Sequence, residues 1–369
     1  MIRSTQKHSK LLPLLLLIPL ILSSCTDGGA GIFYSIEIEQ EIKNRSLPDY
    51  LTAFSYAKIN DMYYLAGGGL YRWDSLVPSQ EWSDMSLPSG WKYTWQVASY
   101  DDPADIEDTL YAILENSDGD RTALYTWDGA WSPSAFSLPE GRPYRLWFVE
   151  NELYVATQET ANETDKKYNY RLYIANNPAD LSLGFSQITV GGSPFVSTNK
   201  PIRDLDAIPA GDFFFITSAV VYTGSVDTFN EAVWPDRYLR NLHYSTTHSS
   251  LFLSTGSQPI NGSGYVYEWN GSAWDGFSSV GGDPNDFGDI VFGGVNYLVI
   301  GTKSGYYESS GGSGFSGESA TINSAAEYDI TDLSSSVVQG LFDGPGDIFF
   351  AMTSGNGLWR NTNKTWSRE

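Results

Sequence analysis

LYTWDG (residues 124–129), followed by Trp131, is the clearest copy of a phrase that recurs along this 369-residue chain. Other copies followed by a tryptophan are LYRWD (70–74), VYEWNG (266–271) and LWRN (358–361). Weaker copies are LYI (172–174), VYT (221–223) and YYE (306–308). The aromatic residue at the second position therefore recurs seven times, at intervals of 40 to 54 residues.

A second repeated element, a short apolar run, precedes each copy of this phrase. Its seven copies are YYLA (63–66), LYAI (110–113), LYVA (153–156), FFFI (213–216), LFLS (251–254), YLVI (297–300) and IFFA (348–351). Each unit then reads as four strands: one that opens the unit, the apolar strand, the aromatic strand, and a polar strand after a turn such as Asp128-Gly129. A period of about 40–50 residues with four strands is typical of a β-propeller. We predict an all-β, seven-bladed propeller with four-stranded blades over residues 32–369.

The two ends of the repeat array suggest how the ring closes. FYSIEI (33–38) alternates like a strand and runs into SLP (46–48), the tripeptide that ends fourth strands at 86–88 and 137–139. The last unit stops soon after Trp366. Pairing the N-terminal strand with the last blade would remove an exposed sheet edge. The sequence therefore predicts a ring closed by the N-terminal strand, with a free N-terminal tether as the alternative.

The first 25 residues have the pattern of a secretory signal. Arg3, Lys7 and Lys10 precede an apolar run over residues 11–22, which is too short to span a bilayer. LSSC (22–25) resembles the bacterial lipobox, in which the cysteine takes a diacylglycerol and the peptidase cuts before it. The resemblance implies a signal peptide over 1–24, lipid on Cys25 and a short tether over 25–31. The next residue, Thr26, favours the outer membrane over the inner one.

Composition excludes several classes of function. The full chain carries a formal charge of −22, and removal of the three basic residues of the signal peptide makes it −25. Such a chain is not suited to nucleic acid, which is bound through Lys and Arg. Cys25 is the only cysteine, so disulfides within the chain and Cys-based metal sites or thiol nucleophiles are excluded.

No sequence pattern indicates a catalytic centre, a metal site or a cofactor. After signal cleavage only His243 and His248 remain, five residues apart and without zinc-type spacing. NSDGD (116–120) has oxygen ligands at alternate positions, as calcium loops do, but lacks the downstream glutamate. We therefore interpret it as a polar hairpin turn and leave calcium open. We expect the repeated Tyr residues to pack between blades.

Three arginines fall at matching places when the units are aligned on their first strands. These are Arg145, Arg203 and Arg240, which stand at or next to the start of this strand in three consecutive units. Asp204, Asn241 and Asp289 fall in the same tier, meaning the same level of the aligned strands. The first strand of a blade lines the central channel, so these side chains could meet at one mouth. Arginine suits bidentate recognition of carboxylates. We predict a site there for an acidic sugar or a partner's carboxylate. The alternative is that each arginine pairs with a local aspartate and only ties blades together.

Taken together, the lipobox and the repeats resemble those of a bacterial β-propeller lipoprotein over the whole chain. This resemblance implies a cell-envelope protein, held to a membrane through lipid on Cys25, that binds or scaffolds a protein or glycan ligand. The absence of a recognisable catalytic set favours a role without catalysis. The alternative is a carbohydrate-active, sialidase-like enzyme, which needs a pair of carboxylates flanking the scissile bond.

Overall fold

The computed structural model describes residue 47 and residues 51–369, apart from 78–80, 101–107, 134–140, 163, 233, 235–237, 257–262, 282, 304, 310–335 and 363–364. The chain divides into two compact units, residues 1–49 and 50–369. The predicted signal peptide (1–24), Cys25 with its tether (25–31) and the closing strand (33–38) lie outside the described residues and stay predictions. Within the described ranges, no helix has the length and apolar character needed to cross a membrane.

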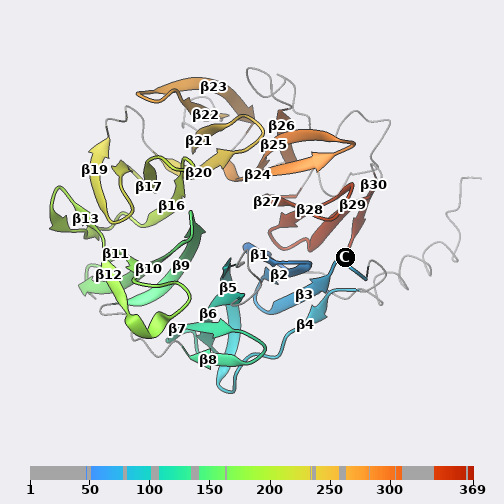
Figure 1. Cartoon of the computed structure of the whole chain (residues 1–369), viewed down its shortest axis with the longest axis horizontal. Helices are drawn as coiled ribbons and strands as arrows, with labels where there is room; N and C mark the ends of the chain where they lie inside the picture. The colour runs from blue at the N-terminus through green and yellow to red at the C-terminus, as the bar shows by residue number, and fades with distance from the viewer. Residues whose placement is uncertain are drawn as a thin grey trace, which may run out of the picture. The chain divides into compact units, whose positions relative to one another are not determined.

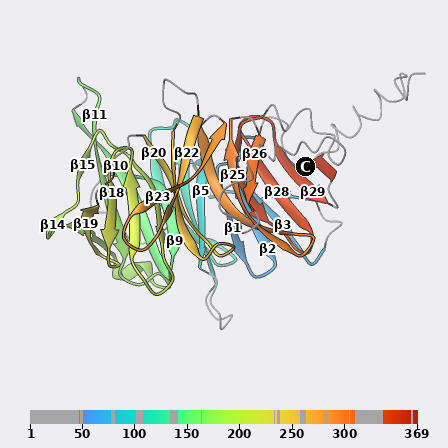
Figure 2. The same cartoon turned by 90° about the horizontal axis from the view of Figure 1, so that it is seen from above.

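Seven sheets of the second unit stand around a common axis, one sheet for each sequence repeat (Figure 1). In the view at right angles, many of their strands run roughly along this axis (Figure 2). The first blade contains β1 (Ser55–Ile59), β2 (Met62–Ala66), β3 (Leu70–Asp74) and β4 (Ser83–Asp84). The second contains β5 (Trp91–Tyr100), β6 (Thr109–Asn116), β7 (Thr122–Trp127) and β8 (Trp131–Pro133). The third contains β9 (Arg142–Val149), β10 (Glu152–Asn162), β11 (Lys167–Ala175) and β12 (Phe185–Gln187). The predicted seven-bladed propeller is confirmed.

The remaining blades follow the same order. The fourth blade contains β16 (Ile202–Ala207), β17 (Phe213–Thr217), β18 (Val221–Gly224) and β19 (Thr228–Ala232), and the fifth contains β20 (Leu239–Ser245), β21 (Ser250–Thr255), β22 (Ser263–Trp269) and β23 (Trp274–Gly281). The sixth contains β24 (Pro284–Phe292), β25 (Val295–Thr302) and β26 (Gly305–Ser309). The seventh contains β27 (Val338–Asp343), β28 (Ile348–Thr353), β29 (Leu358–Thr362) and β30 (Thr365–Arg368). The predicted fourth strand of the sixth blade falls in residues 310–335, outside the described part.

Two blades carry strands beyond the predicted four. The connection between the third and fourth blades contains η1 (Leu181–Leu183), β13 (Thr189–Val190), β14 (Ser193–Pro194) and β15 (Ser197–Thr198). Strand β13 pairs in parallel with β19 and forms a hairpin with β14, which widens the fourth blade to six strands. Strand β15 pairs with β11 in the third blade. This connection therefore links two neighbouring blades through backbone hydrogen bonds.

The apolar second strand of each blade forms the core, because it has a strand on either side and a neighbouring blade against each face. All five residues of β17 are buried, and Phe214 and Phe215 are wholly inaccessible. The turn into the fourth strand follows the predicted chemistry. Gly129 and Gly271 have φ values of 102° and 94°, a backbone conformation that favours glycine. The apolar run thus encodes the buried second strand, and the repeat phrase encodes the hairpin that ends the blade.

The ring closes between the last and first blades through aromatic packing. The ring of Phe350 in β28 packs edge-on against Trp73 of β3 at 5.5 Å and against Trp82 at 5.8 Å. The guanidinium of Arg360 lies 5.5 Å from the Trp73 ring centroid, and the backbone amide of Gly357 donates to the Leu51 carbonyl at 3.2 Å. The last blade has four described strands, β27 to β30, and the predicted closure by residues 33–38 stays a prediction.

Candidate functional site

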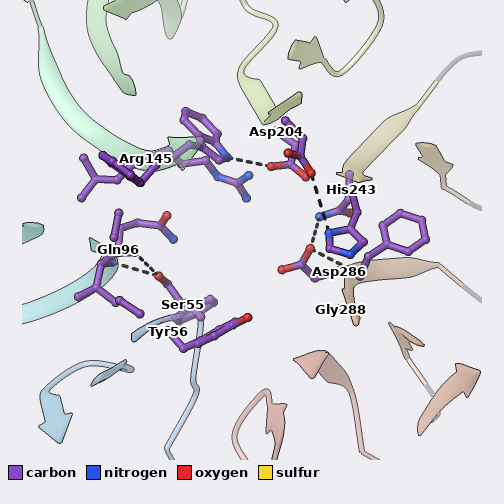
Figure 3. Close-up of a pocket in the computed structure, with 18 of the residues that line it drawn as sticks. Ser55, Tyr56, Gln96, Arg145, Asp204, His243, Asp286 and Gly288 are labelled. Carbon is purple, nitrogen blue, oxygen red and sulfur yellow. Dashed lines mark hydrogen bonds and ion pairs between the residues drawn. The ribbon is translucent and has the colours of Figure 1, made fainter. Parts of the chain in front are cut away.

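A cavity of about 510 Å³ lies where the first strands of the seven blades meet. All seven first strands contribute to its wall, as expected for the axis of a propeller (Figure 3). Its polar lining residues are Ser55, Tyr56, Lys58, Gln96, Ser99, Arg145, Asp204, Asp206, Asn241, His243, Asn285, Asp286, Asp289 and Gln339. A concave site that gathers polar groups from several elements is the usual setting for ligand binding.

A β-bulge interrupts six of the seven first strands at the same level; β1 is the regular one within the described residues. The residues skipped by the pairing are Trp95, Tyr144, Arg203, Arg240, Asn285 with Asp286, and Gln339. Bulges re-aim side chains and are enriched next to functional sites. The next tier along the strands consists of Ser55, Gln96, Arg145, Asp204, Asn241, Asp286 and Gly340. Asp286 is itself the second residue of the β24 bulge.

The structure separates the three predicted arginines into two adjacent tiers. Arg203 and Arg240 are the bulged residues of β16 and β20, whereas Arg145 stands one position past the bulge of β9. Arg145 lines the cavity, and the other two do not. Arg240 Nη2 pairs with Asp283 Oδ2 at 3.1 Å. Burial lowers the pKa of Arg203, and the positive charges of Arg145 and Arg240 lower it further, so Arg203 is repelled by both.

Strand pairing also decides which aspartate shares this level. The sequence alignment put Asp289 in the tier of Asp204 and Asn241, but the pairing register of β24 with β25 places Asp286 there instead. Asp289 lies further along the strand and still lines the cavity. It accepts hydrogen bonds from the Thr246 amide at 2.6 Å and the Ser245 hydroxyl at 2.7 Å, so it connects the sixth blade to the fifth.

Asp204 also connects blades, through backbone and indole N–H groups rather than through an arginine. Its Oδ1 accepts from Trp147 Nε1 at 2.8 Å and from the Leu205 amide at 3.0 Å. Its Oδ2 accepts from the Leu242 amide at 2.8 Å. Asp204 thus joins the third, fourth and fifth blades. This arrangement fits the alternative in which the aspartate only ties blades together. Its partners, however, are N–H groups and not the arginine that this alternative predicted.

His243 lies between two of these carboxylates. Its Nε2 is 3.5 Å from Asp289 Oδ2, and its Nδ1 is 3.9 Å from Asp206 Oδ2. Burial by itself would lower the pKa of His243, but Asp289 and Asp206 outweigh burial and raise it above the ordinary value. The imidazole ring also stacks on Phe287. A protonated His243 therefore links the fourth, fifth and sixth blades by charge.

Stability should fall as pH rises from 5 to 8. Burial raises the pKa of Asp204 to about 7 and of Asp286 to about 6, so the folded chain retains protons that the unfolded chain releases above about pH 4. His243 acts in the same direction, because its stabilisation is complete below its ordinary pKa and is lost as pH rises through the raised one. The lowered pKa of Asp289 matters only in more acidic solution.

Urea denaturation at pH 5, 6, 7 and 8 measures this effect as a falling free energy of unfolding. Asp286→Asn should make the decline shallower, because one of the titrating groups is removed. A free energy of unfolding that rises over this interval would contradict the expectation.

Several lining residues were not singled out from the sequence as candidates for the site. Tyr56, Gln96 and Asp286 carry no motif, and the sequence around His243 indicates neither a metal site nor a catalytic triad. Alignment of all seven first strands at their bulges would have brought them together. Within the described part of the chain, no group of three or more His, Cys, Asp or Glu residues has a metal-binding arrangement. In the 116–120 segment, Asn116 Nδ2 donates to Asp120 Oδ1 at 2.7 Å, and Gly119 has a φ of 71°, as in a tight turn.

Comparison with known proteins identifies the architecture only. No known family and no curated protein matches the sequence. Among solved structures, YCF48 bound to a D1 peptide is similar, with a TM-score of 0.54 and 13% identity over 86% of this chain and 95% of that one. YCF48 from Cyanidioschyzon merolae gives a TM-score of 0.54 and 14% identity over 85% of this chain and 96% of that one. At such low identity the likeness shows the propeller fold and carries no functional residue.

Proposed function

We propose that the chain is a binding or scaffold propeller of the bacterial cell envelope, without catalysis, whose ligand site is the axial cavity. The observation that carries this proposal is Arg145. Its side chain lies in the cavity (Figure 3), and within the described part of the chain it makes no ion pair. Its guanidinium lies over the Trp147 ring, 6.0 Å from the ring centroid. A cation that lies in a walled site without a carboxylate paired to it suits recognition of an anionic group on a ligand.

A carboxylate is the ligand group that this arrangement favours. Arg203 lies in the neighbouring tier, and its Nε is buried without a hydrogen-bond partner in the described structure. Two guanidinium groups that repel one another would both be stabilised by a planar anion with two acceptor oxygens. The propeller of YCF48 is known with a D1 peptide bound, so this architecture can receive a protein segment. A protein partner and a glycan both remain candidates for the ligand.

Substituting Arg145, Arg203 and Arg240 together by Ala should reduce ligand binding about 100-fold or more. Arg145 lines the cavity, and a bidentate pair with a carboxylate gives it two charge-assisted hydrogen bonds, each worth roughly 1.5–3 kcal/mol. The ligand would first be found by pull-down from envelope extract and by a glycan array, and its affinity then measured for each variant. Arg142→Ala is the matched control, since Arg142 is an exposed arginine of the same strand as Arg145. Unchanged affinity, or a large drop in melting temperature, would refute the pocket.

The location of the protein rests on Cys25. We infer from the lipobox that lipid on this residue anchors the chain, in the outer membrane rather than the inner one. The tether over residues 26–31 would span roughly 13 Å if flexible, so the propeller would lie close to the membrane. Cys25→Ala should move the protein from the detergent phase to the aqueous phase of a Triton X-114 separation. A variant that still partitions into detergent would show that the anchor lies elsewhere.

A second candidate function, glycoside hydrolysis, is favoured by one observation. Asp204 and Asp286 are carboxyl groups with raised pKa values in one cavity, as the acid of a glycosidase requires. Against it, both oxygens of Asp204 already accept N–H groups. A panel of chromogenic glycosides tests this directly: turnover that is lost in Asp286→Asn would establish an enzyme.

A further inference from the structure

Two aromatic rings are exposed inside the cavity, although the protein buries most of its large rings. Phe54 is 42% exposed and Tyr56 is 41% exposed, and both line the cavity. Each ring is held by another. Tyr56 stacks on Phe342 with centroids 4.3 Å apart and an interplanar angle of 17°. Phe54 meets Trp95 edge to face at 5.3 Å. Rings fixed in this way, with a face left open, can stack against a ligand.

Groups that can bind hydroxyls surround these rings. The carboxamides of Gln96, Asn241 and Gln339 line the cavity from three different blades. A carboxamide both donates and accepts hydrogen bonds, as a sugar hydroxyl does. The hydroxyl of Tyr56 can also donate and accept hydrogen bonds. An aromatic face beside amide groups is suited to a sugar ring, which has an apolar C–H face and a rim of hydroxyls.

The remaining charges of the cavity permit an anionic sugar. Asp204, Asp206 and Asp289 each accept hydrogen bonds from the first strand of the fifth blade or the turn after it. These N–H groups therefore compensate part of their charge, and the imidazole of His243 lies between Asp206 and Asp289. Arg145 reaches the cavity from a different blade than Tyr56 (Figure 3). The cavity thus offers a guanidinium group and an aromatic platform on separate parts of its wall.

We propose that the cavity binds an acidic sugar residue, whose ring stacks on Tyr56 and Phe54 and whose carboxylate pairs with Arg145. The proposal rests on the binding function assigned to this cavity and adds the class of ligand. Its volume of about 510 Å³ fits a short oligosaccharide, within the range of roughly 300–1,000 Å³ usual for small-ligand sites. A peptide carboxylate would use Arg145 but would not need the aromatic platform or the carboxamides.

The test uses the full chain in detergent and isothermal titration calorimetry. The probes are trigalacturonic acid and 3′-sialyllactose, each with its methyl ester, which keeps the ring and removes the charge. The wild-type protein should bind at least one acid probe at least tenfold more tightly than its ester. Arg145→Ala should remove this difference. Tyr56→Leu and Phe54→Leu should weaken acid and ester alike by about tenfold, and Tyr56→Phe should retain most of the binding.

Two exposed positions outside the cavity provide matched controls, Arg142→Ala and Leu183→Ala, and both should bind as the wild type does. Binding of an acid probe that is unchanged in Tyr56→Leu and Phe54→Leu would overturn the aromatic platform and leave the arginine site standing. Absence of sugar binding, with Arg145-dependent binding of a peptide through its C-terminal carboxylate, would overturn the sugar assignment alone. If no carboxylate-bearing probe binds, the sugar assignment and the binding function of the cavity both fail.

Discussion

Phe350→Ala is expected to lower the free energy of unfolding by about 3–5 kcal/mol, the usual loss when a fully buried phenylalanine is truncated. Phe350 is completely inaccessible and packs against Trp73 and Trp82, which are 1% and 3% exposed. It also stacks on Phe342. The substitution would leave a cavity at the junction of the last and first blades. These two blades come from opposite ends of the propeller sequence, and their contact closes the ring. Denaturation in urea, followed by tryptophan fluorescence, measures the loss.

The control for this prediction is Leu183→Ala. Leu183 is 59% exposed, and surface substitutions usually change stability by less than about 0.5 kcal/mol. Limited proteolysis adds a second readout, because an opened junction should first expose the first and last blades to cleavage. A loss below about 1 kcal/mol in Phe350→Ala would show that the ring is closed mainly by other contacts. The N-terminal strand predicted over residues 33–38 would then become the leading candidate.

Asp204→Ala is expected to cost about 3 kcal/mol or more of the free energy of unfolding. The substitution leaves Trp147 Nε1 and the amides of Leu205 and Leu242 without their acceptor. A buried donor that loses its partner costs roughly 1–3 kcal/mol. Relief of the burial of a carboxyl group offsets part of this loss, because burial has already raised the pKa of Asp204. Chemical denaturation at pH 6 and pH 8 separates the two effects.

Asp286→Ala is the matched control, since Asp286 stands in the same tier of the cavity with fewer partners. It accepts the amide of Phe287 at 2.9 Å, and Asn241 Nδ2 lies at 3.5 Å. Its loss should therefore be clearly smaller than that of Asp204→Ala. If Asp204→Ala is neutral or stabilising while Asp286→Ala is not, the penalty of the buried charge exceeds the value of its hydrogen bonds, and the blade-joining role of Asp204 is wrong.

The sequence by itself determined the number of blades and the identity of their strands. The buried runs such as FFFI (213–216), the aromatic strands and the Gly129 and Gly271 turns all follow from local patterns. Burial, strand periodicity and hairpin chemistry depend on residues a few positions apart. A repeated pattern of this kind therefore predicts a repeated supersecondary unit.

The tertiary structure decided the site, because the site depends on how strands from distant units pair and face one another. The pairing register of β24 with β25 puts Asp286 in the tier where the sequence alignment put Asp289. Strand pairing likewise separates Arg145 from Arg203 and Arg240. The ring of Tyr56 is held in the cavity by stacking on Phe342, a residue 286 positions away in the chain. No local pattern encodes contacts over such a separation; they exist only once the first and last blades meet.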